Sequence, residues 1–342
     1  MRAITYTRQG DASVLELVDR ERLEPGGGEL RLRVHVSGVN PTDWKSRSGA
    51  FGGAPAQETV PNHDGAGVVD AIGAGVTGFS PGDRVWVTLA GDGRPAGGTA
   101  QEFTVVPAER VFPLPAGADF ELGASIGIPA ITAHRALTVA EDGPARLEPG
   151  ALADRTVLVA GGAGAVGNAA IQLARWAGAE VVATVSGDAK AGLATAAGAH
   201  HVINYKEAGA AETIRRLAPD GVELVVEVAA GANAALDLAV LRPRGTISVY
   251  ANDGDAPFGV NVFRSMSLNA RYQFVLLYTV GWDRIEAAAA DIDRAIEDGA
   301  LRVGERAGLP QHRYPLEDTA GAHAADESGE VGKVLITVAG GA

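Results

Sequence analysis

The sequence predicts an α/β protein in which a β-rich antiparallel domain is followed by a doubly wound domain with a parallel sheet. Within residues 1–107, short segments rich in Val, Thr and Ile alternate with Gly, Pro and Asp, which is typical of antiparallel strands. From residue 156 onward, apolar strands alternate with Ala-rich helices. That alternation indicates a parallel sheet with helices on both faces.

Composition limits the class of protein. The 342 residues suggest about two domains, and the net charge of −13 argues against a nucleic-acid or anionic-membrane partner. The chain has no cysteine, which excludes disulfides and thiolate zinc sites. It starts without the apolar core of a signal peptide and has no uncharged apolar run long enough for a membrane span, so we expect a cytoplasmic protein.

The β-rich domain is predicted from five segments. In LRLRVHV, the apolar residues Leu30, Leu32, Val34 and Val36 alternate with polar ones, the period of a strand with one wet face. The predicted strands are RAITYT (2–7), LRLRVHVSGV (30–39), AGVVDAIG (66–73), DRVWVTLA (83–90) and AQEFTVVP (100–107).

The doubly wound domain is predicted to follow a helix over 121–140. Its strands are expected at 156–161, 180–186, 201–205, 223–229 and 245–251, with helices at 168–179, 188–199, near 208–218 and near 232–241. A long Ala-rich helix (282–298) and a final strand, VGKVLITVA (331–339), come last. The polar, Gly/Pro-rich stretch 141–155 is expected to form a long surface loop.

A glycine-rich turn follows the apolar strand TVLVAG. Gly162, Gly164 and Gly167 form G-x-G-x-x-G between this strand and an amphipathic helix. The first glycine permits the tight turn, the second lets the backbone approach a pyrophosphate, and the third lets helix and strand pack closely. With the N–H groups of the helix N-terminus, this turn predicts dinucleotide binding, with Ala165 and Val166 included.

The second strand of this domain bears on the choice of cofactor. NAD-binding chains place an acid at its end to bind the ribose 2′-hydroxyl, whereas here it ends in Ser186 and Gly187. Ser186 can donate to a phosphate and Lys190 can supply a charge, so we expect NADPH. Asp188 would repel a 2′-phosphate if it pointed inward. In the alternative interpretation, Asp188 is a helix N-cap and Lys190 a solvated helix residue.

Over nearly its whole length, the sequence resembles the zeta-crystallin-type NADPH:quinone oxidoreductases of the medium-chain dehydrogenase/reductase superfamily. The stretches that carry the resemblance are MRAITYTRQGDASVLELVD, SGVNPTDWKSRSGAF, PNHDGAGVVDAIGAGVTGFSPGDRVW, IGIPAITAHRAL, AGGAGAVGNAAIQLARWAGA and AAGAHHVINY. The resemblance implies a GroES-like catalytic domain (1–125 and 279–342) with a Rossmann NADPH-binding domain (126–278) inserted in it.

The resemblance also implies site residues. It puts Asn40 and Asp43 beside nicotinamide and substrate. The remaining cofactor contacts that it implies are Thr132 and Lys333 near the cofactor, Ser186, Lys190 and Tyr205 around the 2′-phosphate, and Tyr250, Ala251, Phe274 and Leu276 along the nicotinamide. Where quinone reductases often carry a tyrosine, this chain has Lys45, so a substrate-facing phenol is missing or comes from elsewhere, such as Tyr278.

His63 and Asp64 occupy the position of the His–Glu pair of zinc-dependent relatives. Catalytic zinc needs three protein ligands, but the position of the cysteine ligand is Asn40 here. His134 could be proposed as a further ligand, and so could His35, although strand alternation makes His35 solvated. We therefore expect no metal. His63 then either donates a proton or hydrogen bond to substrate or only holds its loop; we favour the loop.

These observations predict an enzyme that transfers hydride from NADPH to a quinone or an α,β-unsaturated carbonyl without metal. Asn40, Lys45 and His63 are candidates for stabilising charge on the acceptor oxygen. The alternatives are a zinc-type alcohol dehydrogenase, a pathway-specific enoyl reductase and a non-catalytic NADPH-binding protein. The family also implies a homodimer formed through edge strands, with RYQFVLLYTV (271–280) as the candidate edge.

Overall fold

The structure is a computed structural model that describes residues 1–52 and 57–338. The chain forms two compact units, one of residues 1–128 with 311 onward and one of residues 129–310. Helix α2 (Phe120–Leu137) contains the first boundary, between Ile128 and Pro129. Within the described ranges, no helix is both long and apolar enough to cross a membrane.

The first unit is built on an antiparallel-rich sheet in the order β14-β15-β3-β4-β5-β7, with β6 also paired to β3. A separate hairpin joins β1 and β2. The strands are β1 (Arg2–Thr5), β2 (Glu16–Asp19), β3 (Glu29–Gly38), β4 (Asp64–Ile72), β5 (Arg84–Val87), β6 (Phe103–Pro107), β7 (Val111–Pro113), β14 (Gln311–Pro315) and β15 (Lys333–Thr337). The unit's other helices are α1 (Pro41–Ser48) and α9 (Thr319–Glu327).

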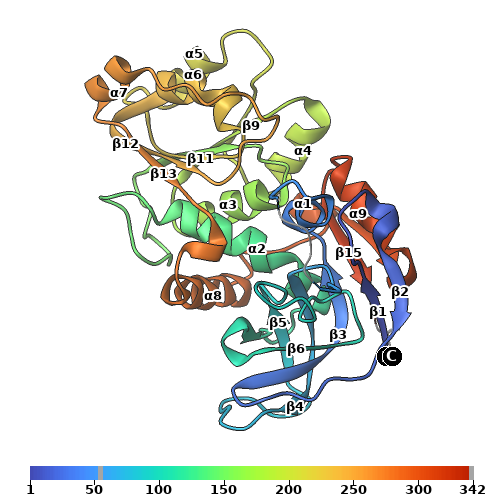
Figure 1. Ribbon diagram of the computed structural model, residues 1–342. Helices are drawn as coiled ribbons and strands as arrows, with labels where there is room; N and C mark the ends of the chain where they lie inside the picture. Colours follow the sequence, from blue (N-terminus) through green and yellow to red (C-terminus); the bar gives the residue numbers. More distant parts are fainter. Residues whose placement is uncertain (53–56, 339–342) are drawn as a thin grey trace. The chain divides into compact units, whose positions relative to one another are not determined.

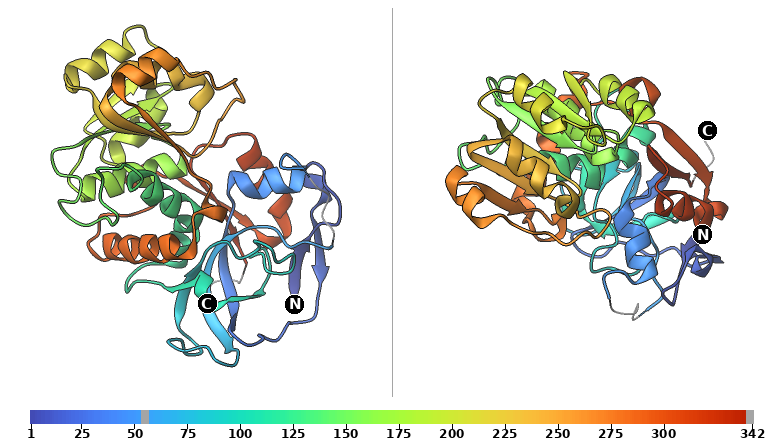
Figure 2. Two further views of the ribbon diagram at one scale, coloured as in Figure 1. Left: turned by 60° about the vertical axis from the view of Figure 1, so that its left-hand side comes forward. Right: turned by 90° about the horizontal axis from the view of Figure 1, so that it is seen from above.

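The C-terminal segment completes this first unit. β15 pairs antiparallel with β3 and parallel with β14, and α9 contacts α1, so the red and blue ends of the chain lie side by side in Figures 1 and 2. The expected final strand is therefore present, although residue 339 lies outside the described residues. The predicted boundary at 279 is wrong: residues 279–310 belong to the second unit because α8 (Trp282–Glu297) packs against α3.

The alternation in β3 has the expected result. Leu30 and Leu32 are buried against Val69 and Val85 in one apolar cluster of this unit. The wet face is less open than the pattern predicts, however, because Arg31 is buried and pairs with Asp70 and Glu24.

The second unit has a six-stranded parallel sheet in the order β10-β9-β8-β11-β12-β13. Its strands are β8 (Thr156–Ala160), β9 (Glu180–Val185), β10 (His201–Asn204), β11 (Val222–Glu227), β12 (Leu241–Val249) and β13 (Arg271–Phe274). Helices α3 (Ala165–Trp176) and α4 (Asp188–Ala196) lie on one face, and α5 (Ala210–Leu217) and α6 (Ala230–Val240) on the other (Figure 1). α7 (Val262–Leu268) packs on β12. The α/β fold class is confirmed.

Two predictions for this unit need correction. The expected strand 271–280 ends at Phe274 and is followed by a 3-10 helix, Leu277–Thr279. Asp188 is not an N-cap, since Gly187 holds that position and Asp188 begins α4.

Candidate functional site

The turn between β8 and α3 leaves the helix N-terminus available to a ligand. Gly164 is the N-cap of α3 and has no side chain to cap the first-turn N–H groups, which are the donors that bind anions at helix starts. A Cβ on Gly164 would meet nothing nearer than 3.5 Å, whereas a Cβ on Gly167 would lie 2.3 Å from the Gly161 carbonyl oxygen. The roles predicted for the second and third glycines therefore fit the geometry.

The first glycine of the motif acts differently from the prediction. The left-handed residue of the turn is Gly161 (φ 67°), which precedes the motif. Gly162 instead permits close packing, because a Cβ there would lie 2.9 Å from the Ala183 Cβ atom. Sequence reasoning missed Gly161, although its place directly after an apolar strand was the available signal.

The predicted 2′-phosphate residues gather at the carboxyl ends of β9 and β10. Ser186 directly follows β9 and is half-buried. The Tyr205 N–H donates to the Val185 carbonyl at 3.1 Å, which brings Tyr205 beside Ser186. Tyr205 and Lys190 are both exposed. The structure thus offers a hydroxyl, a phenol and an ammonium where an NAD-binding chain would have a carboxylate.

The residues predicted along the nicotinamide lie at the carboxyl ends of β12 and β13, at the other end of the sheet. Tyr250 and Ala251 follow β12, and Phe274 ends its neighbour β13. Burial raises the pKa of the Tyr250 phenol, which stays protonated. Phe274 and Leu276 are 60% and 59% exposed. Thr132 is buried in α2.

Sequence reasoning missed a pair of buried acids in this unit. Glu227 ends β11 and Asp237 lies on α6, and both side chains are buried. Burial raises the pKa of both carboxyls, and the charge of Glu227 raises that of Asp237 further. Glu227 also accepts from the Asn233 amide at 2.9 Å, and its hydrogen bond with Asp237 favours the protonated form of Asp237. The acid that closes the apolar run ELVVEVA was the available signal.

In the first unit, Lys333 and Asn40 are joined directly. The Lys333 ammonium donates to Asn40 Oδ1 at 2.7 Å and to the Val39 carbonyl at 2.5 Å. The other end of the Asn40 amide, Nδ2, donates to Asp64 Oδ2 at 2.8 Å. Asn40, Asp64 and Lys333 are all at most 2% exposed. Lys333, predicted near the cofactor, thus binds a side chain of its own unit.

Asp64 receives more donors than Asn40 alone. The Ile128 N–H of α2 donates to its Oδ2 at 2.8 Å and the Thr88 hydroxyl to its Oδ1 at 3.1 Å. This approach requires a glycine in α2, because a Cβ on Gly127 would lie 2.2 Å from Asp64 Oδ1. Asp64 therefore fixes the backbone of α2 as well as the Asn40 side chain.

Asp43 belongs to the same network. It is the N3 residue of α1, and its Oδ2 accepts from the Asn40 N–H at 2.7 Å in a capping box. Its other oxygen is buried without a hydrogen-bond partner in the described part of the chain. Burial, and next the Asp64 charge, raise its pKa well above the usual value. Burial thus favours the protonated form of Asp43.

A third acid, Asp326 on α9, faces the same lysine. Burial raises the pKa of Asp64 and of Asp326, and lowers that of Lys333, whose ammonium the three carboxyls in turn favour. We define Asn40, Asp43, Asp64, Asp326 and Lys333 as the lysine network. Sequence reasoning named four of its members but missed Asp326, and it gave no reason to join Lys333 to Asn40.

His63 lies apart from the network's hydrogen bonds. It is half-buried, and its carbonyl accepts from the Ala90 N–H at 3.0 Å. Burial, and next the charge of Arg110, lower the pKa of the imidazole to about 4. Near neutral pH His63 is therefore uncharged and has no imidazolium proton to give, although the ring can still hydrogen-bond.

The other sequence candidates have different surroundings. Lys45 on α1 is half-buried, with its ammonium 5.5 Å from the centre of the Trp44 ring. His35 is half-buried and not solvated as expected, because it stacks on the Phe120 ring at 4.4 Å. His134 Nε2 lies 2.7 Å from Asp291 Oδ2 in the second unit.

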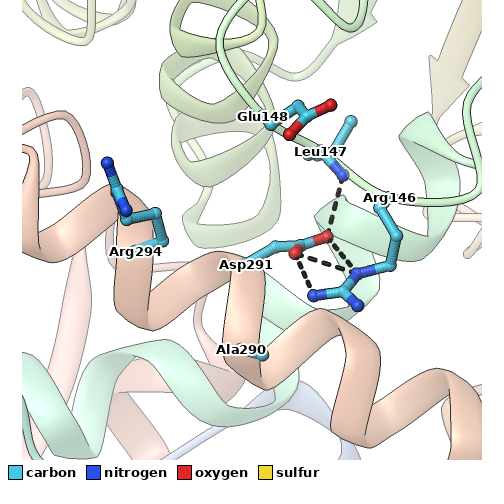
Figure 3. A pocket seen from close by; sticks show the side chains of 6 residues that line it. All are labelled: Arg146, Leu147, Glu148, Ala290, Asp291 and Arg294. Atoms are coloured by element: carbon cyan, nitrogen blue, oxygen red, sulfur yellow. Dashed lines mark hydrogen bonds and ion pairs between the residues drawn. The ribbon is translucent and has the colours of Figure 1, made fainter.

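That histidine contact is part of a clamp that holds the 141–155 segment on α8. Arg146 pairs with Asp291 through two nitrogens, and the Leu147 N–H donates to Asp291 at 2.8 Å (Figure 3). Leu147 and Leu152 are buried, so the segment is anchored and not simply a surface loop. A cavity of about 440 Å³ lies over the clamp. Its two arginines, Arg146 and Arg294, already pair with carboxylates, so we assign it no ligand.

Comparison with known proteins agrees with this geometry. The chain matches the zinc-binding dehydrogenase family over residues 165–294 and the alcohol dehydrogenase GroES-like domain over 26–116. It is 33% identical to the rat (Rattus norvegicus) quinone oxidoreductase and 30% identical to the human (Homo sapiens) one, covering 98% of this chain and 97% of each relative. The chain belongs to the quinone oxidoreductase family. This family lies in the medium-chain dehydrogenase/reductase superfamily, so the resemblance seen in the sequence is confirmed.

Solved structures give the same placement. The Escherichia coli quinone oxidoreductase complexed with NADPH has a TM-score of 0.82 at 26% identity, covering 98% of this chain and 100% of that one. An NAD-dependent alcohol dehydrogenase has a TM-score of 0.84 at 27% identity, covering 99% and 100%. Fold likeness alone therefore does not separate quinone reductases from alcohol dehydrogenases.

The donor set of this quinone oxidoreductase homologue does not fit the zinc that one matching family name implies. Both Asp64 oxygens accept hydrogen bonds, and Asn40 Oδ1 faces an ammonium. Within residues 1–52 and 57–338, no three His, Asp or Glu side chains are grouped so that they could hold a metal ion. Zinc needs three such ligands, so we derive no step through a metal.

Proposed function

We propose that this protein reduces a quinone or an α,β-unsaturated carbonyl with NADPH and without a metal ion. The observation that carries the proposal is that the Lys333 ammonium donates to Asn40, whose amide in turn donates to Asp64. Asn40 and Asp64 stand where zinc-dependent relatives place metal ligands, and here a lysine supplies the positive charge. The quinone oxidoreductase relatives support the acceptor class.

The second unit holds the cofactor in this proposal. The N–H groups of Ala165, Val166 and Gly167 bind the pyrophosphate, and Ser186, Lys190 and Tyr205 bind the 2′-phosphate. The absence of an acid at the end of β9 favours NADPH over NADH. When bound, NADPH supplies the hydride; the protein supplies orientation and charge stabilisation.

The first unit supplies donors for the negative charge that develops on the acceptor oxygen. Asn40 retains one amide hydrogen, Lys45 carries an ammonium, and neutral His63 can donate a ring N–H. Donors fixed in place before the reaction are effective because they need no reorganisation. Water supplies the proton, since the imidazolium form of His63 is absent near neutral pH.

The test is oxidation of NADPH and NADH in the presence of simple quinones or enones. Reduction of NADP⁺ and NAD⁺ by alcohols tests the reverse direction. We expect turnover of NADPH with a quinone or enone, unchanged by chelators. Alcohol oxidation that a chelator abolishes would instead identify a zinc-type alcohol dehydrogenase; one structural neighbour is an NAD-dependent alcohol dehydrogenase. NADPH binding without turnover of any acceptor would identify a binding protein.

We also propose a homodimer formed through the second unit. β13 is an edge strand of the parallel sheet, and exposed edges tend to pair. Apolar side chains lie exposed on and near this edge: Val262, Phe263, Met266, Phe274 and Leu276. A second copy of the chain would cover them.

A further inference from the structure

The Asn40 side-chain amide can bind Lys333 and Asp64 in only one of its two flipped orientations. Lys333 can only donate, so the Asn40 oxygen must face it, and ionised Asp64 can only accept, so the Asn40 nitrogen must face it. The assignment of oxygen and nitrogen in this amide therefore follows from the chemistry of its partners.

The same contacts leave one hydrogen of the amide unused. Nδ2 carries two hydrogens, one of which bonds Asp64, and within the described residues no second acceptor contacts Nδ2. The amide carries a cation at its oxygen and an anion at its nitrogen, and charged partners polarise a hydrogen-bonded chain in a low-dielectric interior. Polarisation in this direction draws electron density from the nitrogen toward the oxygen and so makes the remaining N–H a stronger donor.

We propose that Lys333 is a positioning residue, which together with Asp64 orients and polarises Asn40 so that the second Nδ2–H binds the acceptor oxygen. Lys333 acts through Asn40 and does not bind cofactor. The inference rests on the proposed reductase function. It departs from the expectation that Lys333 lies near the cofactor, because the Lys333 ammonium is bonded to Val39 and Asn40.

The burial of the network explains why a lysine is needed. Three carboxyls, of Asp43, Asp64 and Asp326, surround one ammonium. An uncompensated buried carboxylate takes up a proton. Protonation would weaken Asp64 as an acceptor for Nδ2. The Lys333 charge opposes the rise in the pKa of Asp64 that burial causes, and so favours the ionised form that holds Asn40 in its single orientation.

The test is a double-mutant cycle between Lys333→Met and Asn40→Ala. We expect Lys333→Met to lower kcat about tenfold or more, since loss of one preorganised oxyanion donor costs about 10²–10³, while the Kd for NADPH, measured by fluorescence, stays unchanged. In the Asn40→Ala background, Lys333→Met should lower kcat less than twofold further. Such non-additivity is the sign of two residues that act as one unit.

Controls separate this role from a general effect on folding. Arg33→Met removes a cation from an exposed position on β3 of the same unit and should change neither kcat nor Kd. If Lys333→Met fails to fold, Lys333→Met with Asp64→Asn removes a cation and an anion together, and the same fall in kcat is expected.

Unchanged kcat in a folded Lys333→Met variant would overturn the inference but leave the proposed function standing. A weakened Kd for NADPH with kcat intact would do the same, because it would make Lys333 a cofactor ligand. Equal, additive losses of kcat in both backgrounds would also overturn the inference. If the unaltered protein turns over no quinone or enone, the proposed function fails, and the inference fails with it.

Discussion

In the β8–α3 turn, a methyl group would fit on Gly164 but would collide with backbone on Gly167. On Gly164 its nearest neighbour is 3.5 Å away, and on Gly167 it is 2.3 Å from the Gly161 oxygen. We expect Gly164→Ala to cost less than about 1 kcal/mol of unfolding free energy, yet to weaken NADPH binding at least tenfold, because the methyl occupies the side from which a pyrophosphate approaches.

Gly167→Ala is the matched comparison. It should destabilise the protein by about 1–3 kcal/mol through overpacking. Thermal unfolding and fluorescence titration with NADPH measure both effects. Equal NADPH affinity in Gly164→Ala and the unaltered protein would show that the ligand does not approach this turn.

The low pKa of His63 has a consequence for stability. The folded protein holds this imidazole neutral down to a pKa of about 4, against 6.5 when exposed, so the unfolded chain binds the proton more readily. The unfolding free energy therefore falls as the pH drops from 6.5 toward about 4. We expect His63→Gln to lose less stability over that range, measured by urea unfolding at a series of pH values. Parallel curves for both proteins would contradict the burial of His63.

At this scale, the sequence identifies residues better than their partners. His63 and Asp64 could be selected because their types and adjacent positions indicate chemistry, and Asn40 and Asp43 because the family resemblance points to them. The bond from Lys333 to Asn40 could not, because 293 positions separate them and only the pairing of β15 with β3 brings them together. Gly161 was missed because G-x-G-x-x-G begins at Gly162, although Gly161 directly follows the apolar strand.

The clamp between the 141–155 segment and α8 should contribute to the stability of the second unit. Asp291 accepts from His134, Arg146 and the Leu147 N–H. Burial opposes the charge, but these donors outweigh it and lower the pKa of Asp291. Asp291→Ala leaves the donors unpaired, so we expect a loss of about 3 kcal/mol in unfolding free energy.

The pH dependence of this loss follows from the sign of the shift. A carboxyl with a lowered pKa contributes stability above its unfolded value of 3.8, and that contribution disappears as the pH falls through the folded value. The difference between Asp291→Ala and the unaltered protein should therefore shrink below pH 3.8. Asp298→Ala, at the exposed pair with Arg294 on the same helix, is the control and should cost less than about 1 kcal/mol. If Asp298→Ala lost as much unfolding free energy as Asp291→Ala, the clamp would not stabilise the protein more than an exposed ion pair does.

Periodicity predicted most elements, and packing explains the exceptions. The alternating strands and helices of the second unit occur where expected because the inner strands β8, β9 and β11 are buried between two helical layers. RYQFVLLYTV was too long as a strand prediction, since after Phe274 the chain turns into Leu277–Thr279. The 141–155 segment looked like a free loop because its buried anchors, Leu147 and Leu152, are isolated among polar, Gly and Pro residues.

For the whole molecule, the exposed apolar residues beside β13 predict the oligomeric state. Phe263 on α7 is 82% exposed, which is costly for a large apolar side chain unless a second copy covers it. We expect the unaltered protein to be a dimer by light scattering and Phe263→Glu to shift it toward monomer. Thr195→Glu, an exposed change on α4 beside β10 at the opposite edge of the sheet, should remain a dimer. A monomeric unaltered protein would exclude the proposed interface.

The bond between Lys333 and Asn40 also orders events in time. During synthesis, residues 1–128 leave the ribosome long before β15, and domains generally fold in the order in which they emerge. Until residue 333 follows, the carboxyls of Asp43 and Asp64 have no buried cation to face. The N-terminal segment of the first unit must therefore wait, incompletely assembled, while the entire second unit is made and can fold. β15 is made after the second unit, and its pairing with β3 completes the first unit.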